Sequence, residues 1–359
     1  MDKIRSAWGH PKTESFHFER IGNFAALTER KGFHQLSKQS QQDIDICELF
    51  IFIDRTNSKV GQQYLFKKLI QPAITTEGLH LLNERANLFT GNVVLREEIQ
   101  AELTRLNTNN AYYIASLLHD NLLERPPWFK FLPINILAIV ILLVLSFNYP
   151  VLLIALIFPL AANMLLHIWN KINTYQFFKS FPQLSLLIDV SDGISKKDSQ
   201  LRNTGVKESI AILRPFQWKL RLISLDGSIK DDLNQIGFYL IELVKAFLLI
   251  EVYTLFHLTR ELETKKESIL TLFNYVGDID VAISVASLRA GAQKTCIPYF
   301  TEEKKELLLK NIYHPLIQNC TKNDLYIRGN SVLITGSNMS GKTTFLRTIF
   351  INSILAQTL

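Results

Sequence analysis

The feature that most constrains the fold is a long stretch without charge. From Phe131 to Trp169 the sequence contains no Asp, Glu, Lys or Arg. Asn148 and Pro150 favour a turn near its middle. Two helices of about 17 and about 20 residues would flank that turn, against the roughly 20 residues that span a bilayer. Because soluble helices usually carry a polar face and this stretch has none, we predict a transmembrane helical hairpin over 131–169. The alternative is a helical hairpin buried in a large soluble core.

Aromatic and basic residues flank the predicted hairpin. Trp128 and Trp169 stand at its outer ends and Tyr149 at its turn, which is typical of aromatic belts. Four basic residues follow on the side of both chain termini: Arg125, Lys130, Lys171 and Lys179. This arrangement predicts two spans in the inner, cytoplasmic membrane, with both termini in the cytoplasm.

Three polar residues lie within the uncharged stretch. Asn135, Asn163 and His167 would either mark a polar pathway or form contacts between helices. We favour helix contacts, because two helices do not make a transporter. A second apolar stretch, Ile236–Leu258, carries charges at about helical spacing. It predicts an amphipathic helix packed in a soluble domain; the alternative is a third span.

Composition sets wider bounds on the chain. With 359 residues, 47% hydrophobic and 20% charged, the sequence is long and apolar enough for two or three domains with cores. The net charge of +6 is spread without a dense Lys/Arg run, so charge alone is weak evidence for nucleic-acid binding. Cys47, Cys296 and Cys320 form no CxxC or Cys/His cluster, which argues against a disulfide framework or a zinc site. The first residues lack the apolar region of a signal peptide.

The pattern along the chain predicts a mostly α protein in four parts. Residues 1–130 are expected to be helical, with breaks near Pro11, Pro72, Gly91 and Arg125 to Pro127. The hairpin occupies 131–169, and 170–298 is helical again, with loop-rich sections at Asp189–Ser199 and Arg202–Gly205. Residues 299–359 differ, because Asp324–Thr335 alternates like a strand before an apolar helix. This last part is predicted to be the start of an α/β domain.

A phosphate-binding loop is predicted near the C-terminus. Its residues match G-x-x-x-x-G-K-[ST] and are followed by a second threonine: Gly336, Ser337, Asn338, Met339, Ser340, Gly341, Lys342, Thr343 and Thr344. The glycines let backbone N–H groups approach phosphate oxygens, Lys342 supplies a charge to the β/γ-phosphates, and Thr343 offers a hydroxyl to Mg²⁺. The apolar segment Ser331–Thr335 is predicted as the preceding strand and Thr344–Gln357 as the following helix. We therefore predict an ATP and Mg²⁺ site; the alternative is an accidental glycine-rich turn.

Hydrolysis would need a further strand that ends in an Asp to hold the metal. Two stretches imitate such a strand, "LFIFID" ending at Asp54 and "LSLLID" ending at Asp189. Both precede the loop by a long way and lie in helical surroundings. We interpret both as core segments.

The loop "TGSNMSGKTT" resembles the T-G-x-N-M-x-G-K-[ST]-T loop of the MutS family of mismatch-repair ATPases. Three further stretches agree in order. Ile53–Pro72 resembles the start of the family's core or lever domain, Val276–Ala290 the helix that returns to the ATPase, and Ile312–Ile317 the Arg-His-Pro-Leu motif that precedes it.

The resemblance implies a helical MutS-like core or lever with the hairpin inserted, followed by the start of an ABC-type P-loop ATPase domain. It also implies ATP and Mg²⁺ as cofactors, a homodimer formed through the ATPase domain, DNA as a partner, and helices that move with nucleotide state. Carried over by position, Asn338 and Lys342 would meet phosphates, Thr343 the metal, and Cys320–Asn323 the adenine.

Departures from the family pattern narrow the hypothesis. Core similarity begins near residue 49, which leaves no room for the family's mismatch-reading domains, and the hairpin falls where the family inserts its DNA-gripping clamp. The chain thus looks like the membrane-anchored MutS-related branch. The Asp-bearing strand, the dimer signature loop and the switch His would follow Leu359, so we expect a chain truncated after the phosphate loop.

The leading functional hypothesis is a membrane-anchored, MutS-like ATP-binding protein linked to DNA binding and mismatch repair, with nucleotide state coupled to a helical lever. ATPase activity is implied by the family alone. Two alternatives stand beside it: a membrane-associated remodelling ATPase that acts on protein or lipid partners, and an inactive truncated product.

Overall fold

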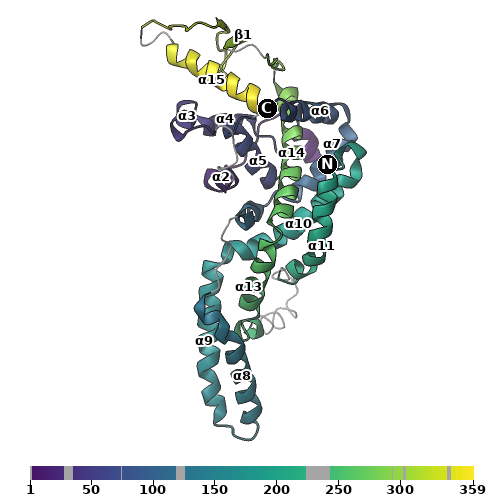
Figure 1. The fold of residues 1–359 in the computed structure, drawn as a ribbon, viewed down its shortest axis with the longest axis vertical. Coiled ribbons are helices and arrows are strands. Elements are labelled where there is room, and N and C mark those ends of the chain that lie inside the picture. Colours follow the sequence, from purple (N-terminus) through teal and green to yellow (C-terminus); the bar gives the residue numbers. More distant parts are fainter. Residues whose placement is uncertain are drawn as a thin grey trace. The chain divides into compact units, whose positions relative to one another are not determined.

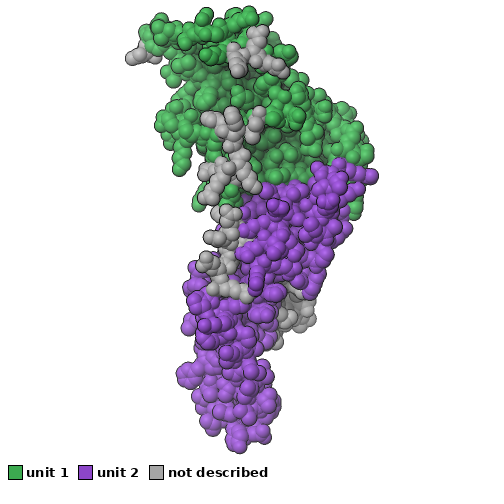
Figure 2. Space-filling view, in the orientation of Figure 1, with its two compact units in different colours: residues 1–109, 193–201, 273–359 green, residues 110–192, 202–272 purple. Residues whose placement is uncertain are grey.

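The computed structural model describes residues 2–27, 35–73, 75–118, 126–223, 243–292, 294–301, 305–337 and 341–359. These residues are mostly helical, as predicted, and divide into two compact units (Figures 1 and 2). Unit 1 comprises residues 1–109, 193–201 and 273–359, and unit 2 comprises 110–192 and 202–272. Each unit is discontinuous in sequence, because the long helices α10 and α14 contribute residues to both.

Unit 1 is built mainly from short N-terminal helices and the C-terminal segment. Its elements are α1 (Asp2–Ala7), α2 (Phe18–Leu27), α3 (Lys38–Asp43), α4 (Ile46–Ile53), α5 (Lys59–Ile70), α6 (Glu77–Gly91), α7 (Val93–Thr104), the end of α10 (Tyr175–Lys197) from Gly193, η4 (Ser199–Leu201), α14 (Lys266–Gly291) from Phe273, β1 (Glu306–Ile312), β2 (Asn323–Arg328) and α15 (Lys342–Thr358).

Side-chain caps explain where several of these helices begin. Ser58 Oγ accepts the backbone N–H of Gly61 at 2.9 Å and so starts α5. Asn92 Oδ1 accepts the N–H of Leu95 at 3.0 Å, which starts α7 directly after α6 ends at Gly91. Each cap satisfies a backbone donor that the first helical turn leaves without a partner. The breaks predicted near Pro11, Pro72 and Gly91 are confirmed.

Helices α5 and α14 cross closely at two glycines. A Cβ placed on Gly61 would meet Asp280 Oδ2 at 2.1 Å, and one on Gly277 would meet Tyr64 Cγ at 2.5 Å. Beside this crossing, the rings of Phe24 and Phe273 pack with their centroids 4.2 Å apart. The glycines of the two sequence motifs at 53–72 and 276–290 therefore permit a backbone approach that a larger residue would prevent.

Unit 2 contains the predicted hairpin. Its elements are η2 (Asn109–Leu118, from Asn110), η3 (Pro127–Phe131), α8 (Leu132–Ser146), α9 (Leu152–Asn173), α10 (Tyr175–Lys197, to Asp192), α11 (Thr204–Ile223), α13 (Ile250–Glu263) and the first part of α14. The two helices over 131–169 and the turn between them are confirmed by α8 and α9. Many apolar side chains of this pair face outward; Ile157 is 61% exposed and Phe158 76%.

Three helices within the described part of the chain are long and apolar enough to cross a membrane. They are Pro127–Ser146, Leu152–Asn173 and Lys266–Gly291, with mean hydropathies of 2.4, 2.1 and 1.5. They differ in burial: 11% and 17% of the apolar window is buried inside the protein in the first two, against 78% in α14. The apolar character of α14 is thus matched by protein contacts, whereas that of α8 and α9 is not.

The loop-rich section predicted at Asp189–Ser199 is wrong over most of its length. Helix α10 runs through it to Lys197. Ser191 is buried and its Oγ donates to the Leu187 carbonyl within the helix at 2.7 Å. A Cβ added to Gly193 would lie 3.3 Å from the Glu102 carboxyl carbon. The small residues that favour a loop by composition are here used for close helix packing. The loop predicted at Arg202–Gly205 is confirmed at Arg202 and Asn203 only, because α11 begins at Thr204. There Asn203 Oδ1 accepts the N–H of Gly205 at 2.9 Å.

Candidate nucleotide-binding loop and the helices that meet it

The two glycines of the predicted phosphate loop have backbone angles that favour glycine. Gly336 has φ 151° and Gly341 has φ 82°. A Cβ on Gly341 would meet no atom within 4 Å, so its positive φ and not crowding accounts for the glycine. Asn338, Met339 and Ser340 lie outside the described residues.

Lys342 begins helix α15 directly after the loop. Its Nζ donates to the Gly336 carbonyl oxygen and so bends back across the loop. The N–H of Phe345 donates to the Gly341 carbonyl at 2.9 Å, which closes the first helical turn. No acidic residue lies in that turn. Thr343 is exposed and Thr344 half-buried. A cationic side chain above a helix N-terminus suits an anionic phosphate group.

The strand predicted at Ser331–Thr335 is not formed. These residues have no regular secondary structure, and Leu333 is 87% exposed. The strand-like alternation appears earlier, in β2, which pairs antiparallel with β1 in the register Glu306↔Arg328. A strand before a phosphate loop ordinarily lies inside a parallel sheet and takes its backbone partners from neighbours on both sides. Among the described residues, β1 and β2 are the only strands, and neither pairs with 331–335.

Helix α15 is docked on the N-terminal helices of unit 1. Its buried side chains lie on one face: Thr348, Ile351, Ile354 and Thr358. At its C-terminal end, the Gln357 carbonyl accepts the N–H of Ala73, just beyond α5, at 3.1 Å. Nearer the loop, Arg347 forms an ion pair with Asp45 at 3.0 Å. Helix α15 therefore connects the loop to residues that flank α4 and α5.

The predicted His-Pro motif meets the same helix. The Asn352 side chain of α15 donates to the Tyr313 carbonyl at 3.2 Å. The neighbouring His314 is buried, and its Nδ1 accepts the N–H of Leu316 at 3.4 Å. Burial lowers the pKa of His314, the Arg347 guanidinium lowers it further, and Asp45 opposes both. His314 thus acts as a neutral packing residue and hydrogen-bond acceptor.

A buried carboxylate joins the two sequence motifs at 53–72 and 276–290. Asp280 of α14 accepts the N–H and side-chain amide of Asn57 at 2.7 and 3.0 Å. It also accepts the N–H and hydroxyl of Ser58 at 2.8 and 2.6 Å. Burial raises the pKa of Asp280, and the hydrogen bonds from Ser58 and Asn57 oppose this without cancelling it. We call Asp280, Asn57 and Ser58 the α14 clasp.

Further polar residues of α14 extend the clasp along one helix face. Ser284 Oγ accepts the N–H of Arg55 at 2.9 Å, and Ser287 Oγ accepts the N–H of Gly9 at 2.9 Å. Sequence reasoning missed this set. The signal was the spacing of Asp280, Ser284 and Ser287 at positions i, i+4 and i+7 of an apolar helix, which places them on one face.

Neither Asp54 nor Asp189 ends a strand. Asp54 follows helix α4 and is fully buried, where Lys12 Nζ contacts it at 3.0 Å and Gln62 donates to it at 2.7 Å. Burial alone would raise the pKa of Asp54, but Lys12 and the hydrogen bonds of Thr56 and Gln62 lower it overall. Asp189 lies inside α10 and accepts a hydrogen bond from Gln217 at 2.7 Å. Their interpretation as core segments is confirmed.

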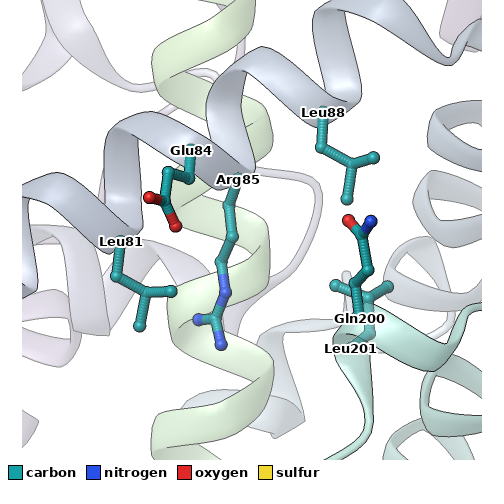
Figure 3. Close-up of a pocket in the computed structure, with 6 residues that line it drawn as sticks. All are labelled: Leu81, Glu84, Arg85, Leu88, Gln200 and Leu201. Carbon is teal, nitrogen blue, oxygen red and sulfur yellow. The ribbon is translucent and has the colours of Figure 1, made fainter.

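Two other site types find no support in the described part of the chain. No group of His, Cys, Asp and Glu there suits a metal ion, and the three cysteines are free thiols. A pocket in unit 1 lies between α6 and the turn at Gln200 (Figure 3). Its volume of about 100 Å³ is well below the roughly 300 Å³ at which ligand pockets usually begin. It is too small for a nucleotide.

No known family profile matches the chain. Curated relatives do match parts of it. The chain is 36% identical over 104 residues to the DNA mismatch repair protein MutS of Pseudothermotoga lettingae, which covers 27% of this chain and 12% of that protein. It is 31% identical over 105 residues to the endonuclease MutS2 of Streptococcus equi subsp. equi, covering 29% of this chain and 13% of that protein.

A longer match has lower identity. The chain is 25% identical over 150 residues to the MutS of Bacillus cytotoxicus, covering 40% of this chain and 16% of that protein. In each case the chain spans less than a fifth of the length of the relative. The matches are distant and partial, and they support a relationship of this chain to the MutS family.

Proposed function

We propose that this chain is a membrane-anchored, MutS-like nucleotide-binding protein. The observation that carries the proposal is the placement of Gly336, Gly341 and Lys342 at the N-terminus of a helix whose other end is docked beside α5. A phosphate held by the loop would therefore contact an element that is itself packed on the helical core. The proposal concerns nucleotide binding; hydrolysis would need an Asp-bearing strand, and none lies among the described residues.

The described loop residues fit ATP with Mg²⁺. Lys342 would hold the β/γ-phosphates together with backbone N–H groups of the loop and of the first turn of α15. Exposed Thr343 would supply a hydroxyl oxygen to Mg²⁺, which neutralises phosphate charge when bound. Asn338 would join the phosphate contacts by family resemblance, and Cys320–Asn323 would lie near the adenine.

The contacts of α15 provide a route from nucleotide to helical core. Arg347 contacts Asp45 before α4, and Gln357 contacts Ala73 after α5. Helix α5 in turn is clasped to α14 through Asp280. We propose that a shift of α15 on nucleotide binding moves α5 and α14 together.

The hairpin α8–α9 is proposed to anchor the chain in the cytoplasmic membrane. Its outward apolar side chains have few protein contacts, which is the pattern expected where acyl chains are the neighbours. Two spans would place both termini on the cytoplasmic side, where the phosphate loop can meet ATP. Membrane flotation of the full chain, repeated with α8 and α9 deleted, tests the anchor.

DNA is the proposed partner, because relatives that match the chain are named for DNA mismatch repair. We further propose a homodimer formed through a complete ATPase domain. Duplex, mismatched and branched DNA should bind with an affinity that falls as salt rises. If no DNA binds at low ionic strength, and a protein or lipid partner changes nucleotide affinity instead, the remodelling alternative replaces this one.

A binding titration tests the nucleotide site directly. A fluorescent ATP analogue with Mg²⁺ should bind the detergent-solubilised chain, and Lys342→Ala should weaken binding at least about tenfold, or about 1.4 kcal/mol. Lys310→Ala is the matched control, because Lys310 is an exposed lysine on β1 outside the loop. Equal affinity in the two variants would remove the phosphate-loop assignment.

A further inference from the structure

The tryptophans and the turn of the hairpin provide two reference levels for depth in the membrane. The rings of Trp128 and Trp169 lie 6.2 Å apart at the end of the hairpin away from its turn. Along α9, the rise of 1.5 Å per residue puts Trp169 about 26 Å from Leu152. This nearly equals the roughly 30 Å of a bilayer's hydrocarbon core. In a hairpin that spans the membrane, the two tryptophans mark one interface and the turn at 147–151 marks the other.

A fully buried amide lies about a third of the way from the tryptophans to the turn. Asn163 is 0% exposed and accepts a hydrogen bond from Asn135 of α8, which confirms helix contact for these two residues. Its own Nδ2 donates to the backbone carbonyl of Phe247. At 1.5 Å per residue, Asn163 is about 9 Å nearer the turn than Trp169. Phe247, which belongs to neither hairpin helix, therefore lies at that depth.

From Phe247 the chain runs back to the level of the tryptophans. Phe256 packs against Trp128 and Phe129, with ring centroids 6.5 and 5.1 Å away. Tyr253 stacks on Phe129 at 5.9 Å. Leu249 and Val252 are buried with Leu132 between these levels. Residues 247–256 thus lie beside the end of the hairpin away from its turn and run in the same direction as α9 (Figure 1).

A helix break follows Phe247 directly. Residues 243–247 are helical, α13 begins only at Ile250, and Leu249 between them has φ 50°. Irregular backbone is costly at membrane depth unless protein groups satisfy it. The bond from Asn163 Nδ2 to the Phe247 carbonyl supplies such a group at the break. A polar side chain in the middle of an apolar helix thereby has a specific structural use.

Several side chains of the segment are apolar and exposed. Leu243, Val244, Ile250 and Tyr253 are between 44% and 51% exposed. The ionisable side chains nearby lie close to one another. The Glu251 carboxylate oxygens are 3.8 Å from His167 Nδ1 and 4.0 Å from Lys245 Nζ. Paired charges cost less at the membrane than isolated ones.

We propose that residues 243–256 form a third membrane-embedded element, which reaches about a third of the way into the bilayer beside α9 and contacts acyl chains through Leu243, Val244 and Ile250. The inference rests on the proposed hairpin anchor and adds to it a partly inserted segment. The sequence prediction for Ile236–Leu258 covers this segment, and residues 236–242 lie outside the described residues. For the described part, the proposal replaces both predictions from the sequence, since the element neither spans the membrane nor lies wholly within a soluble domain.

Spin labels on the full chain in phosphatidylcholine bilayers test the depth. Single cysteines would replace Val244, Leu165 in α9 and Glu208 in α11, in a background with Cys47, Cys296 and Cys320 changed to serine. We expect labels at 244 and 165 to collide with oxygen, which concentrates in the acyl chains, and to lose collisions with a water-soluble nickel complex. The label at 208 should show the opposite.

The outcomes separate this inference from the anchor. If 165 is lipid-exposed while 244 collides with nickel as 208 does, the partly inserted element is wrong and the hairpin anchor stands. If 165 and 244 both collide with nickel, the anchor fails and the inference fails with it. Asn163→Leu should raise nickel collisions at 244, because the break loses its hydrogen bond, whereas Met164→Leu beside it should not.

Discussion

The carboxylate of Asp280 on α14 occupies the space in which Gly61 of α5 would carry a side chain. An added Cβ on Gly61 would lie 2.1 Å from Asp280 Oδ2 and 2.5 Å from its Cγ. That carboxylate cannot easily move aside, because Asn57 and Ser58 hold it with four hydrogen bonds. Helix contact and polar clasp therefore depend on each other.

Gly61→Ala should destabilise the protein. The new methyl group would separate α5 from α14 or break the bonds of Asp280, and overpacking of this kind costs about 1–3 kcal/mol. Thermal unfolding of the solubilised chain, followed by circular dichroism, measures the change. Gly78→Ala in α6 is the matched control, because nothing lies within 4 Å of its added Cβ and alanine is the better helix former. Equal melting temperatures for the two variants would contradict the packing described.

Asp280→Asn should also lower stability. An amide presents N–H groups toward two backbone N–H donors, so one of the donors at Asn57 or Ser58 loses its acceptor in a buried site. The expected loss is about 1–3 kcal/mol in the free energy of unfolding. Ser284→Ala, which removes a single acceptor for Arg55, should cost less, and Glu267→Gln on the exposed start of α14 should be neutral. A neutral Asp280→Asn would show that the clasp does not hold α14.

His314 should make stability pH-dependent. Its folded pKa is lower than the ordinary value of 6.5, so the unfolded chain binds more protons there. Stability from this residue is full above pH 6.5 and is lost as pH falls below it. Urea unfolding at pH 7.5 and pH 5.5 should therefore show a smaller acid loss in His314→Asn than in the exposed control His80→Asn. An unchanged acid loss in His314→Asn would contradict the burial-driven shift.

Thr343 should act through the metal alone. Thr343→Val removes the hydroxyl proposed to contact Mg²⁺ and should weaken ATP-analogue binding in the presence of Mg²⁺ by about tenfold. Without Mg²⁺ the variant and the unaltered chain should bind alike. Thr343→Ser keeps the hydroxyl and serves as control. A loss of affinity that is the same with and without Mg²⁺ would place Thr343 outside the metal site.

The sequence predicted correctly those elements that are determined by residues close together in the chain. The hairpin followed from an uncharged stretch with a turn at Asn148 and Pro150, and the break at Gly91 followed from the glycine itself. The helix through Ser191 and Gly193 was not predicted, because small polar residues suit a loop and a tight helix contact equally. Only the position of Glu102 against Gly193 distinguishes the two, and that contact is distant in sequence.

The residues of the candidate site also fall into those that the sequence identifies and those that only the fold brings together. The loop glycines and Lys342 form a contiguous motif with a specific chemistry, so the sequence alone identifies them. The clasp could not be predicted with equal ease, because Asp280 and Asn57 are brought together only by the crossing of α5 and α14. The prediction of a strand at Ser331–Thr335 was wrong for a related reason. Alternating apolar and polar residues identify a segment that can pair as a strand, but they do not provide the neighbouring strand.

The four hydrogen bonds that Asp280 accepts from Asn57 and Ser58 restrict how α14 can move. A slide of one helical turn, about 5.4 Å, would bring Val276 or Ser284 opposite Asn57 and Ser58, and neither side chain offers two carboxylate oxygens. The helix has one registration with the 54–58 loop and no neighbouring one of comparable energy. Any displacement of α14 must therefore move that loop with it. Within unit 1, a shift of α14 is passed on to the loop and is not lost by one element sliding past the other.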